Sequence, residues 1–290
     1  MIADLHCHYP MHVVMHEPRH RIEHLLRMHG RLRGDEIRVL VVRAASALFN
    51  DEHMWSTERV SVEHLQQGGA RLVFSVLHSP FHEWFHEWDL SRRYGAPPED
   101  AYFATVRLQI DEVESDLDKS DDSVVTLVRD ADTLERALAS GAIAFVHCLE
   151  GGVSLGSSTE QIERNIAELK RHGVAYITPA HLFYRQVATN APAIPFLHDA
   201  VGIRRKEGRF DESFEVTCRH IDKLHEITGS HEYVALGTDF DGFIKPTMGG
   251  LETPADLRLL EARLAERYGD DAALITSGNA LRVLRELWRP

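Results

Sequence analysis

The chain has 290 residues, which suits one large α/β domain or two small ones. Hydrophobic residues make up 43% of the sequence and charged residues 27%, so we expect neither a disordered chain nor a membrane-spanning one. The formal net charge of -13 argues against nucleic acid as a partner, because binding to a phosphate backbone depends on clustered Lys and Arg.

The N-terminal residues lack the basic and apolar regions of a signal peptide, and the longest apolar run, from Val39, is interrupted by Arg43. We therefore expect a cytoplasmic protein that does not bind a membrane. The three cysteines are odd in number and widely spaced, which predicts buried thiols rather than disulfides; they are Cys7, Cys148 and Cys218. Histidine is abundant, with 19 residues, and imidazole is the commonest metal ligand.

Short runs rich in Val, Ile, Leu, Ala and Phe predict buried strands at residues 2–8, 38–48, 72–78, 142–150, 174–181 and 233–239. Helices are predicted from Ser158, where Gln161 completes a capping box, to Gly173; from about 211 to 229; from Thr253; and over 279–287. This alternation predicts a parallel sheet covered by helices, and the architecture we expect is a (β/α)8 barrel of the TIM type.

The stretch from about 79 to 103 breaks this alternation. It is aromatic and rich in histidine, and it runs through Ala96, Pro97 and Pro98. We interpret it as a lid-like excursion inserted in a single domain that spans residues 1–290.

The first chemical signal is the run Asp4-Leu5-His6-Cys7-His8 at the end of the first predicted strand. Side chains alternate along a strand, so Asp4, His6 and His8 should share one face while Leu5 and Cys7 face the helices. A His-x-His pair at the carboxyl end of a barrel strand can chelate a divalent ion. The alternative is that these are merely polar residues at a strand exit.

Carboxylates end two later strands. Glu150 precedes two glycines, and its two oxygens allow it to bridge two cations, although an exposed Glu before a turn is common. Asp239 ends the last strand, where Ala235 and Gly237 share its face, and it can act as a general base and then protonate a leaving amine. We assign Asp241 to a turn and discount it. The carboxyl ends of barrel strands are neighbours, so these groups should meet the two histidines.

A further strand end carries His181, which could polarise a substrate carbonyl or bind its oxyanion, and Tyr184 follows it. We predict that His181 and Tyr184 contact the substrate. A lone histidine at such a place is equally consistent with a structural role.

The chain resembles the renal (membrane) dipeptidase family of the amidohydrolase superfamily. The resemblance rests on the acidic-His motif near the start, Glu-Gly-Gly at 150–152, Thr-x-x-His at 178–181, Gly-x-Asp-Phe-Asp-Gly at 237–242 and Gly-Asn-Ala-Leu-Arg-Val at 278–283. It implies that Glu150 bridges two zinc ions, that His6 and His8 hold one of them with Asp239, and that His181 contacts the substrate. It also implies hydrolysis of dipeptides or related small amides.

Two departures from the family matter. His8 stands where the family often has Asp, a change that should still bind metal. The two further histidines of the second metal site and the arginine for the substrate carboxylate are not evident between Leu182 and Phe210, where His198 is the single candidate ligand. Eight strands cannot be counted. We infer either a true deletion, with one metal, or a segment missing from the printed sequence near residues 200–203, and we favour the second.

Two rival functions stay open. The run His82-Glu83-Trp84-Phe85-His86 matches the H-E-x-x-H pattern of zinc proteases, but it lies in the excursion with no clear third ligand. A barrel without its second metal site could instead be a binding protein without turnover. We favour a zinc-dependent hydrolase with one or two divalent ions and a small-molecule substrate, and the sequence leaves open whether the protein forms a homo-oligomer.

Overall fold

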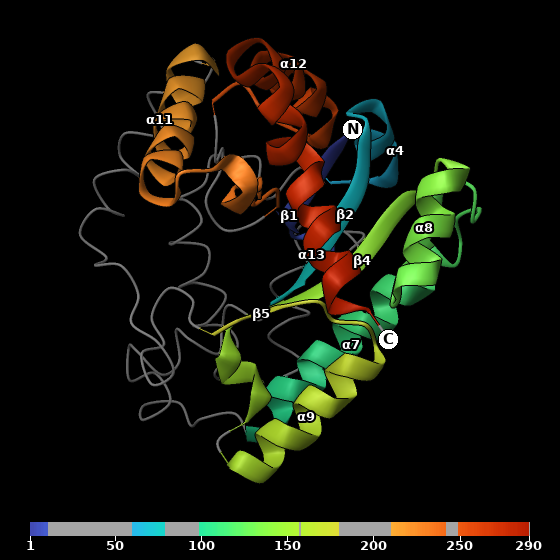
Figure 1. Ribbon diagram of the computed structural model, residues 1–290. Coiled ribbons are helices and arrows are strands. Elements are labelled where there is room, and N and C mark those ends of the chain that lie inside the picture. Colours follow the sequence, from blue (N-terminus) through green and yellow to red (C-terminus); the bar gives the residue numbers. More distant parts are fainter. Residues whose placement is uncertain (11–59, 79–98, 157, 180–209, 242–248, 290) are drawn as a thin grey trace, which may run out of the picture.

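The computed structural model describes residues 1–10, 60–78, 99–156, 158–179, 210–241 and 249–289 (Figure 1). A parallel sheet lies at its centre, curled like part of a barrel. The strands are β1 Ile2–Cys7, β2 Ala70–Leu77, β3 Val125–Leu127, β4 Ile143–Glu150 and β5 Ile177–Thr178. Their order is β1-β2-β4-β3, and β5 also pairs with β4. The predicted parallel sheet is therefore confirmed, and the strands in the described part of the chain do not close into a barrel.

Helices flank this sheet on both faces. They are α4 Val62–Gln67, α7 Glu99–Leu117, α8 Ala131–Ser140, α9 Thr159–Arg171, α11 Phe210–Thr228, α12 Leu257–Tyr268 and α13 Asn279–Leu287. Short turns of other helix types are η2 Gly152–Leu155, η3 His231–Tyr233, η4 Pro254–Asp256, η5 Gly269–Asp271 and the π-helix η6 Leu274–Gly278. The predicted helices after Ser158, near 211, after Thr253 and over 279–287 are confirmed.

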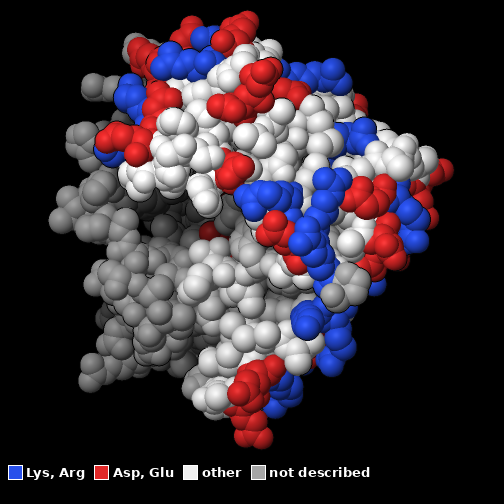
Figure 2. Space-filling model, in the orientation of Figure 1, with Lys and Arg blue, Asp and Glu red and all other residues white. Residues whose placement is uncertain are grey.

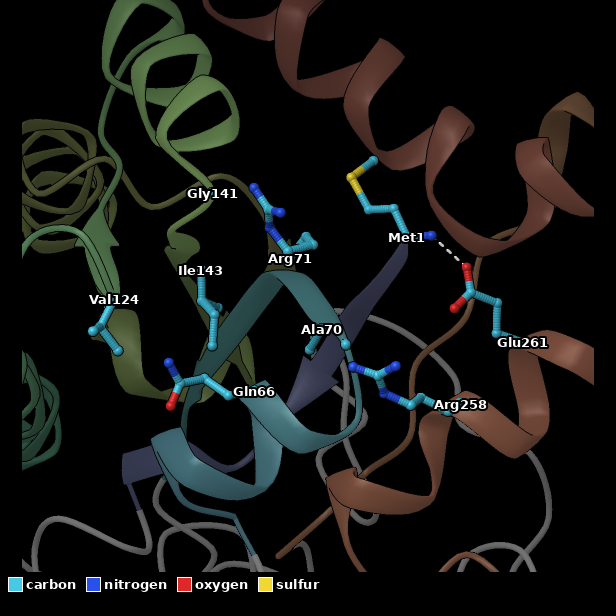
Figure 3. A pocket seen from close by; sticks show the side chains of 10 residues that line it. Met1, Gln66, Ala70, Arg71, Val124, Gly141, Ile143, Arg258 and Glu261 are labelled. Carbon is cyan, nitrogen blue, oxygen red and sulfur yellow. Dashed lines mark hydrogen bonds and ion pairs between the residues drawn. The ribbon is translucent and has the colours of Figure 1, made fainter.

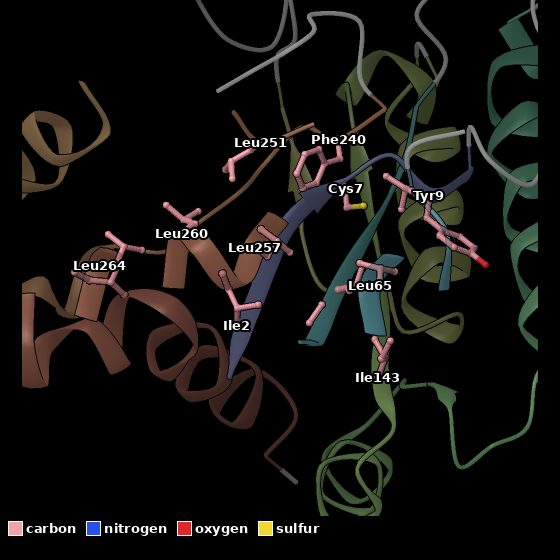
Figure 4. Packing of buried hydrophobic residues seen from close by; sticks show 14 of the residues in the cluster. Ile2, Cys7, Tyr9, Leu65, Ile143, Phe240, Leu251, Leu257, Leu260 and Leu264 are labelled. Atoms are coloured by element: carbon pink, nitrogen blue, oxygen red, sulfur yellow. The ribbon is translucent and has the colours of Figure 1, made fainter. Parts of the chain in front are cut away.

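Each face of the sheet has its own hydrophobic core. Ile2, Val73 and Phe145 pack in the larger cluster, which also contains residues of α4, α7, α11 and α12 (Figure 4). Leu72 and Val146 belong to a second cluster that contains residues of α8 and α13. A closed barrel turns one face of its sheet toward its own strands. Here α13, the last helix, packs against the face of the sheet that carries Leu72 and Val146.

The segment after η3 lies beside β1, as predicted for the last strand. The amide of Leu5 donates to the carbonyl of Leu236 (2.8 Å), and the amide of Asp239 donates to the carbonyl of His6 (2.8 Å). Its backbone is not a regular strand, however, because Asp239 and Asp241 adopt left-handed φ values of 57° and 61°. The prediction that this segment lies beside β1 is correct, and the prediction that it forms a regular strand is wrong.

Strict alternation along β1 was a wrong prediction. The pairing of β1 with β2 shifts register between Asp4 and Cys7. As a result Leu5 packs against the cluster beneath α13, while Cys7 packs in the cluster beneath α12. An irregular strand carries an extra residue that reverses the alternation of side chains, and the pattern of apolar residues did not reveal it.

The helix α7 begins at Glu99, so the last residues of the predicted excursion belong to a helix, and residues 79–98 lie outside the described residues. The sequence did carry a signal for α7, because Val106, Ile110 and Val113 recur at helical spacing and are buried. The other predicted features at 38–48 and 200–203 also lie outside the described residues.

A polar cluster joins α7 to β4 and to the end of α9. His147, Arg129 and His172 together lower the pKa of Glu114 to about 2, against the opposing effect of burial. Arg129 lies 2.7 Å from the Glu114 carboxylate and His172 lies 3.3 Å from it, whereas His147 is 3.7 Å away, beyond normal hydrogen-bond length. Arg129 and His172 are therefore the partners of this carboxylate at hydrogen-bond distance, and His147 lies just beyond them.

Charged side chains of both signs are interspersed on the face seen in Figure 2, notably over α11 and α12. All three cysteines are buried and free, as predicted. Among the helices that the structure describes, none combines the length and the apolar character needed to cross a bilayer.

Candidate metal centre

Four side chains from distant parts of the sequence meet at the carboxyl ends of β1 and β4. His6 Nε2 lies 3.2 Å from Glu150 Oε1 and 3.7 Å from Asp239 Oδ1. His8 Nε2 lies 2.9 Å from Asp239 Oδ1 and 3.6 Å from Glu150 Oε2. The structure thus brings together the four residues that the sequence singled out as ligands.

The four side chains differ in how far they reach solvent. The exposed fraction is 4% for His8, 10% for Glu150, 23% for His6 and 33% for Asp239. Asp239 is therefore the most accessible of the four from solvent, and Glu150 and His8 are the most deeply buried.

The electrostatics of the centre call for positive charge. Burial lowers the pKa of His6. The hydrogen bond with Glu150 and the charges of Glu150, Asp239 and Asp4 raise it, and the net result is a pKa above the usual value of histidine. Carboxylates gathered around imidazoles favour either a proton or a metal ion at the ring nitrogen.

The centre is anchored by Asp4, which is buried on the side of β1 that faces the 234–240 segment. Its carboxylate accepts hydrogen bonds from the Thr238 hydroxyl (2.6 Å), the Thr238 amide (3.0 Å) and the His6 amide (3.1 Å). Burial raises the pKa of Asp4 to about 6, although these hydrogen bonds lower it. Asp4 therefore ties the strand that carries the histidines to the segment that carries Asp239.

Gly237 permits the close approach of these two segments. A Cβ atom added at Gly237 would lie 2.9 Å from the Cβ of His6, closer than two side chains approach in practice. The small residue that the sequence placed on the face of Asp239 is thus needed to let His6 sit beside this segment.

His78, just beyond β2, borders the centre and was not singled out from the sequence. Its Nδ1 donates to the carbonyl oxygen of Glu150 (3.2 Å) and lies 3.7 Å from Glu150 Oε2. The side chain of Gln109 holds the backbone of His78 through two hydrogen bonds, of 2.9 Å and 2.7 Å. The signal available in the sequence was one more histidine at the end of a predicted strand, the run 72–78.

The donor set fits a divalent metal ion. One ligand atom each from His6, His8 and Asp239 lie within 4.8 Å of one another, and Glu150 contacts both histidines. Two imidazole nitrogens with carboxylate oxygens are ligands that zinc accepts. This group of three is the one such cluster found among the described residues.

Asp241 has the structural role that the sequence gave it. It is buried, and its carboxylate accepts a hydrogen bond from the Val60 amide (2.9 Å). The predicted substrate contacts His181 and Tyr184 lie outside the described residues. So do His198 and the competing run from His82 to His86.

A separate hollow lies at the amino-terminal ends of the strands, opposite the metal centre (Figure 3). It measures about 520 Å³ and is lined by Met1, Arg71, Arg258 and Glu261 among others. The amine of Met1 is paired with Glu261. No histidine or cysteine stands among the described residues that line it.

The sequence model of the membrane dipeptidases (peptidase family M19) matches residues 208–288, which include Asp239. The predicted resemblance to the membrane dipeptidases is thereby confirmed. The matched part includes α11, the segment that carries Asp239, and the helical elements α12, η5, η6 and α13. No curated protein matches the chain in sequence.

Solved structures of dipeptidases share the fold. A metallopeptidase from Rhodobacter sphaeroides, liganded with a phosphinate mimic of the dipeptide L-Ala-D-Ala, matches with a TM-score of 0.57 at 15% identity, over 99% of both chains. A dipeptidase of family M19, dipeptidase AC, has a TM-score of 0.54 at 16% identity, over 86% of this chain and 96% of its own. The probable dipeptidase PvdM from Pseudomonas aeruginosa has a TM-score of 0.52 at 11% identity, over 86% and 98%. At these identities the likeness is one of fold.

Proposed function

We propose that the protein is a metal-dependent hydrolase that cleaves dipeptides or related small amides. The observation that carries the proposal is the convergence of His6 Nε2, His8 Nε2 and Asp239 Oδ1, with the Glu150 carboxylate 3.2 Å from His6. The family match over residues 208–288 and the fold shared with M19 dipeptidases support it.

In this proposal His6, His8, Glu150 and Asp239 would hold zinc. A divalent cation in this place would supply Lewis acidity, which makes water a usable nucleophile near neutral pH. The residues themselves would fix its position, because β1 and the residue after it carry the two imidazoles, and the hydrogen bond between Asp4 and Thr238 holds Asp239 beside them.

Asp239 is the group we assign to proton transfer. It is the most exposed of the four, so an attacking water and the leaving amine can both reach its carboxylate. It would accept a proton from the water and return that proton to the amine nitrogen, as a general base followed by a general acid. Glu150, largely buried, would stay a ligand and orient both histidines.

The test is hydrolysis of dipeptides by the purified chain, before and after removal of metal and readdition of zinc. The panel should include dipeptides with an L- and with a D-residue at the carboxyl-terminal position, with release of free amine as the readout. Asp239→Asn is the diagnostic variant, and Asp111→Asn, on the exposed surface of α7, is the matched control.

We expect zinc-dependent cleavage of at least one dipeptide. Asp239→Asn should lower kcat by about 100-fold or more, since general acid-base groups contribute on that order, and Asp111→Asn should match the wild type. Zinc binding without cleavage of any dipeptide or small amide would refute the hydrolase and favour a binding protein. Full activity in Asp239→Asn would remove Asp239 from the mechanism.

A further inference from the structure

Tyr176, immediately before β5, contacts the metal centre through the outer nitrogen of His6. Its hydroxyl donates to the carbonyl oxygen of Leu5 (2.6 Å) and lies 3.2 Å from His6 Nδ1. The ring of Tyr176 stacks on Phe74, with centroids 5.7 Å apart. Tyr176 and His6 are thus in contact although they lie far apart in the sequence.

The hydrogen bonds define where the protons are. A phenol has a single proton, and the Leu5 carbonyl can only accept it. The Tyr176 oxygen is therefore an acceptor toward His6, so Nδ1 of His6 must carry a proton. In the neutral ring Nε2 then bears the lone pair, and Nε2 is the atom that faces Glu150 and Asp239.

Cys148 lies beside the Tyr176 hydroxyl but is not the acceptor of its proton in this arrangement. Cys148 donates its own thiol proton to the carbonyl of Ser75 (3.5 Å). The Leu5 carbonyl thus remains the acceptor for the phenol proton, at 2.6 Å.

We propose that Tyr176 is a positioning residue: it holds His6 in the Nδ1–H form and so presents the Nε2 lone pair to the cation. This inference rests on the proposed function, because it names what prepares a ligand of the same centre. Partners of the non-ligating nitrogen fix ring orientation and tautomer in metal sites generally, and their loss lowers metal affinity by about 10- to 100-fold.

The experiment measures zinc affinity of the metal-free chain by competition with a chelator. Tyr176→Phe removes the hydroxyl and keeps the ring that stacks on Phe74. Tyr268→Phe is the matched control, since that hydroxyl of α12 has its acceptors in α11, the Asp222 carboxylate at 3.0 Å and the Cys218 carbonyl at 3.2 Å, which share its one proton. We expect Tyr176→Phe to lose about 10- to 100-fold in zinc affinity. Tyr268→Phe should bind zinc like the wild type.

A second readout does not depend on a variant that folds. Long-range ¹H–¹⁵N correlation spectra of the metal-free wild type, recorded with the His6 ring neutral, report which nitrogen of His6 carries the proton, with His6→Gln to assign the signal. We expect the Nδ1–H form. An Nε2–H ring in the wild type, or unchanged zinc affinity in Tyr176→Phe, would overturn the role of Tyr176. A wild type that takes up no zinc would instead overturn the proposed function, and the ring spectrum would still test Tyr176.

Discussion

Replacement of Thr238 should weaken the hydrogen bonding between Asp4 and the segment that carries Asp239, and so lower the stability of the fold. The Thr238 hydroxyl donates to the buried carboxylate of Asp4 (2.6 Å) and accepts from the amide of Phe240 (3.1 Å). With a pKa of about 6, Asp4 is mostly charged at pH 7, so the first of these bonds is charge-assisted. Valine has nearly the same shape as threonine and lacks the hydroxyl, so Thr238→Val removes both bonds without opening a cavity.

The expected cost follows from these two bonds. Losing a hydrogen bond to a charged group costs about 1.5–3 kcal/mol, and losing the acceptor of a backbone amide costs about 1 kcal/mol more. Thr238→Val should therefore lower the free energy of unfolding by about 3 kcal/mol. Thr238→Ser keeps the hydroxyl and loses one methyl group, so its cost should be about 1 kcal/mol or less.

The assay is equilibrium urea unfolding of the metal-free chain at pH 7, followed by far-ultraviolet circular dichroism, with wild type, Thr238→Val and Thr238→Ser side by side. The reasoning requires the valine variant to be clearly less stable than the serine variant. Equal stability of the two variants would show that the hydroxyl does not tie Asp4 to the segment that carries Asp239.

Three further predictions follow from the same structure. Gly237→Ala should lower zinc affinity at least about tenfold, measured by chelator competition, because the new methyl group would press on the Cβ of His6 and push a ligand out of line; unchanged affinity would contradict the close packing. The pKa of Glu114 is lowered in the folded chain, so its contribution is complete above its unfolded value of 4.5 and is lost as the pH falls toward about 2. Glu114→Gln should cost about 1–2 kcal/mol in urea unfolding at pH 7, after discounting for solvent screening, and clearly less at about pH 3; a cost independent of pH would refute the assignment. All three cysteines should react with a thiol reagent only after unfolding, since they are buried, and prompt reaction of the native chain would contradict their placement.

The candidate metal centre could be anticipated because its residues follow a simple topological rule. His6, His8 and Glu150 stand at the carboxyl ends of predicted strands, and such ends lie at one edge of a parallel sheet. Asp239 could be preferred over Asp241 by its position relative to small residues, and the geometry agrees, since Asp239 reaches both histidines and Asp241 binds a backbone amide.

What the sequence could not provide depends on contacts between distant segments. The register shift within β1 has no local signature, and it separates Leu5 from Cys7. The left-handed backbone of Asp239 could not be assigned from the sequence, because aspartate adopts that region more often than most residues but still only occasionally. The contact between Tyr176 and His6 joins residues far apart in the chain, so no motif search would have paired them.

The central claim is that His6, His8, Glu150 and Asp239 surround one divalent cation. Anomalous diffraction at the zinc edge, from crystals of the zinc-loaded chain, tests it directly. We predict a peak about 2.0–2.2 Å from the Nε2 atoms of both histidines and from carboxylate oxygens of Asp239 and Glu150. Zinc bound elsewhere, or no peak between these four side chains, would contradict the account.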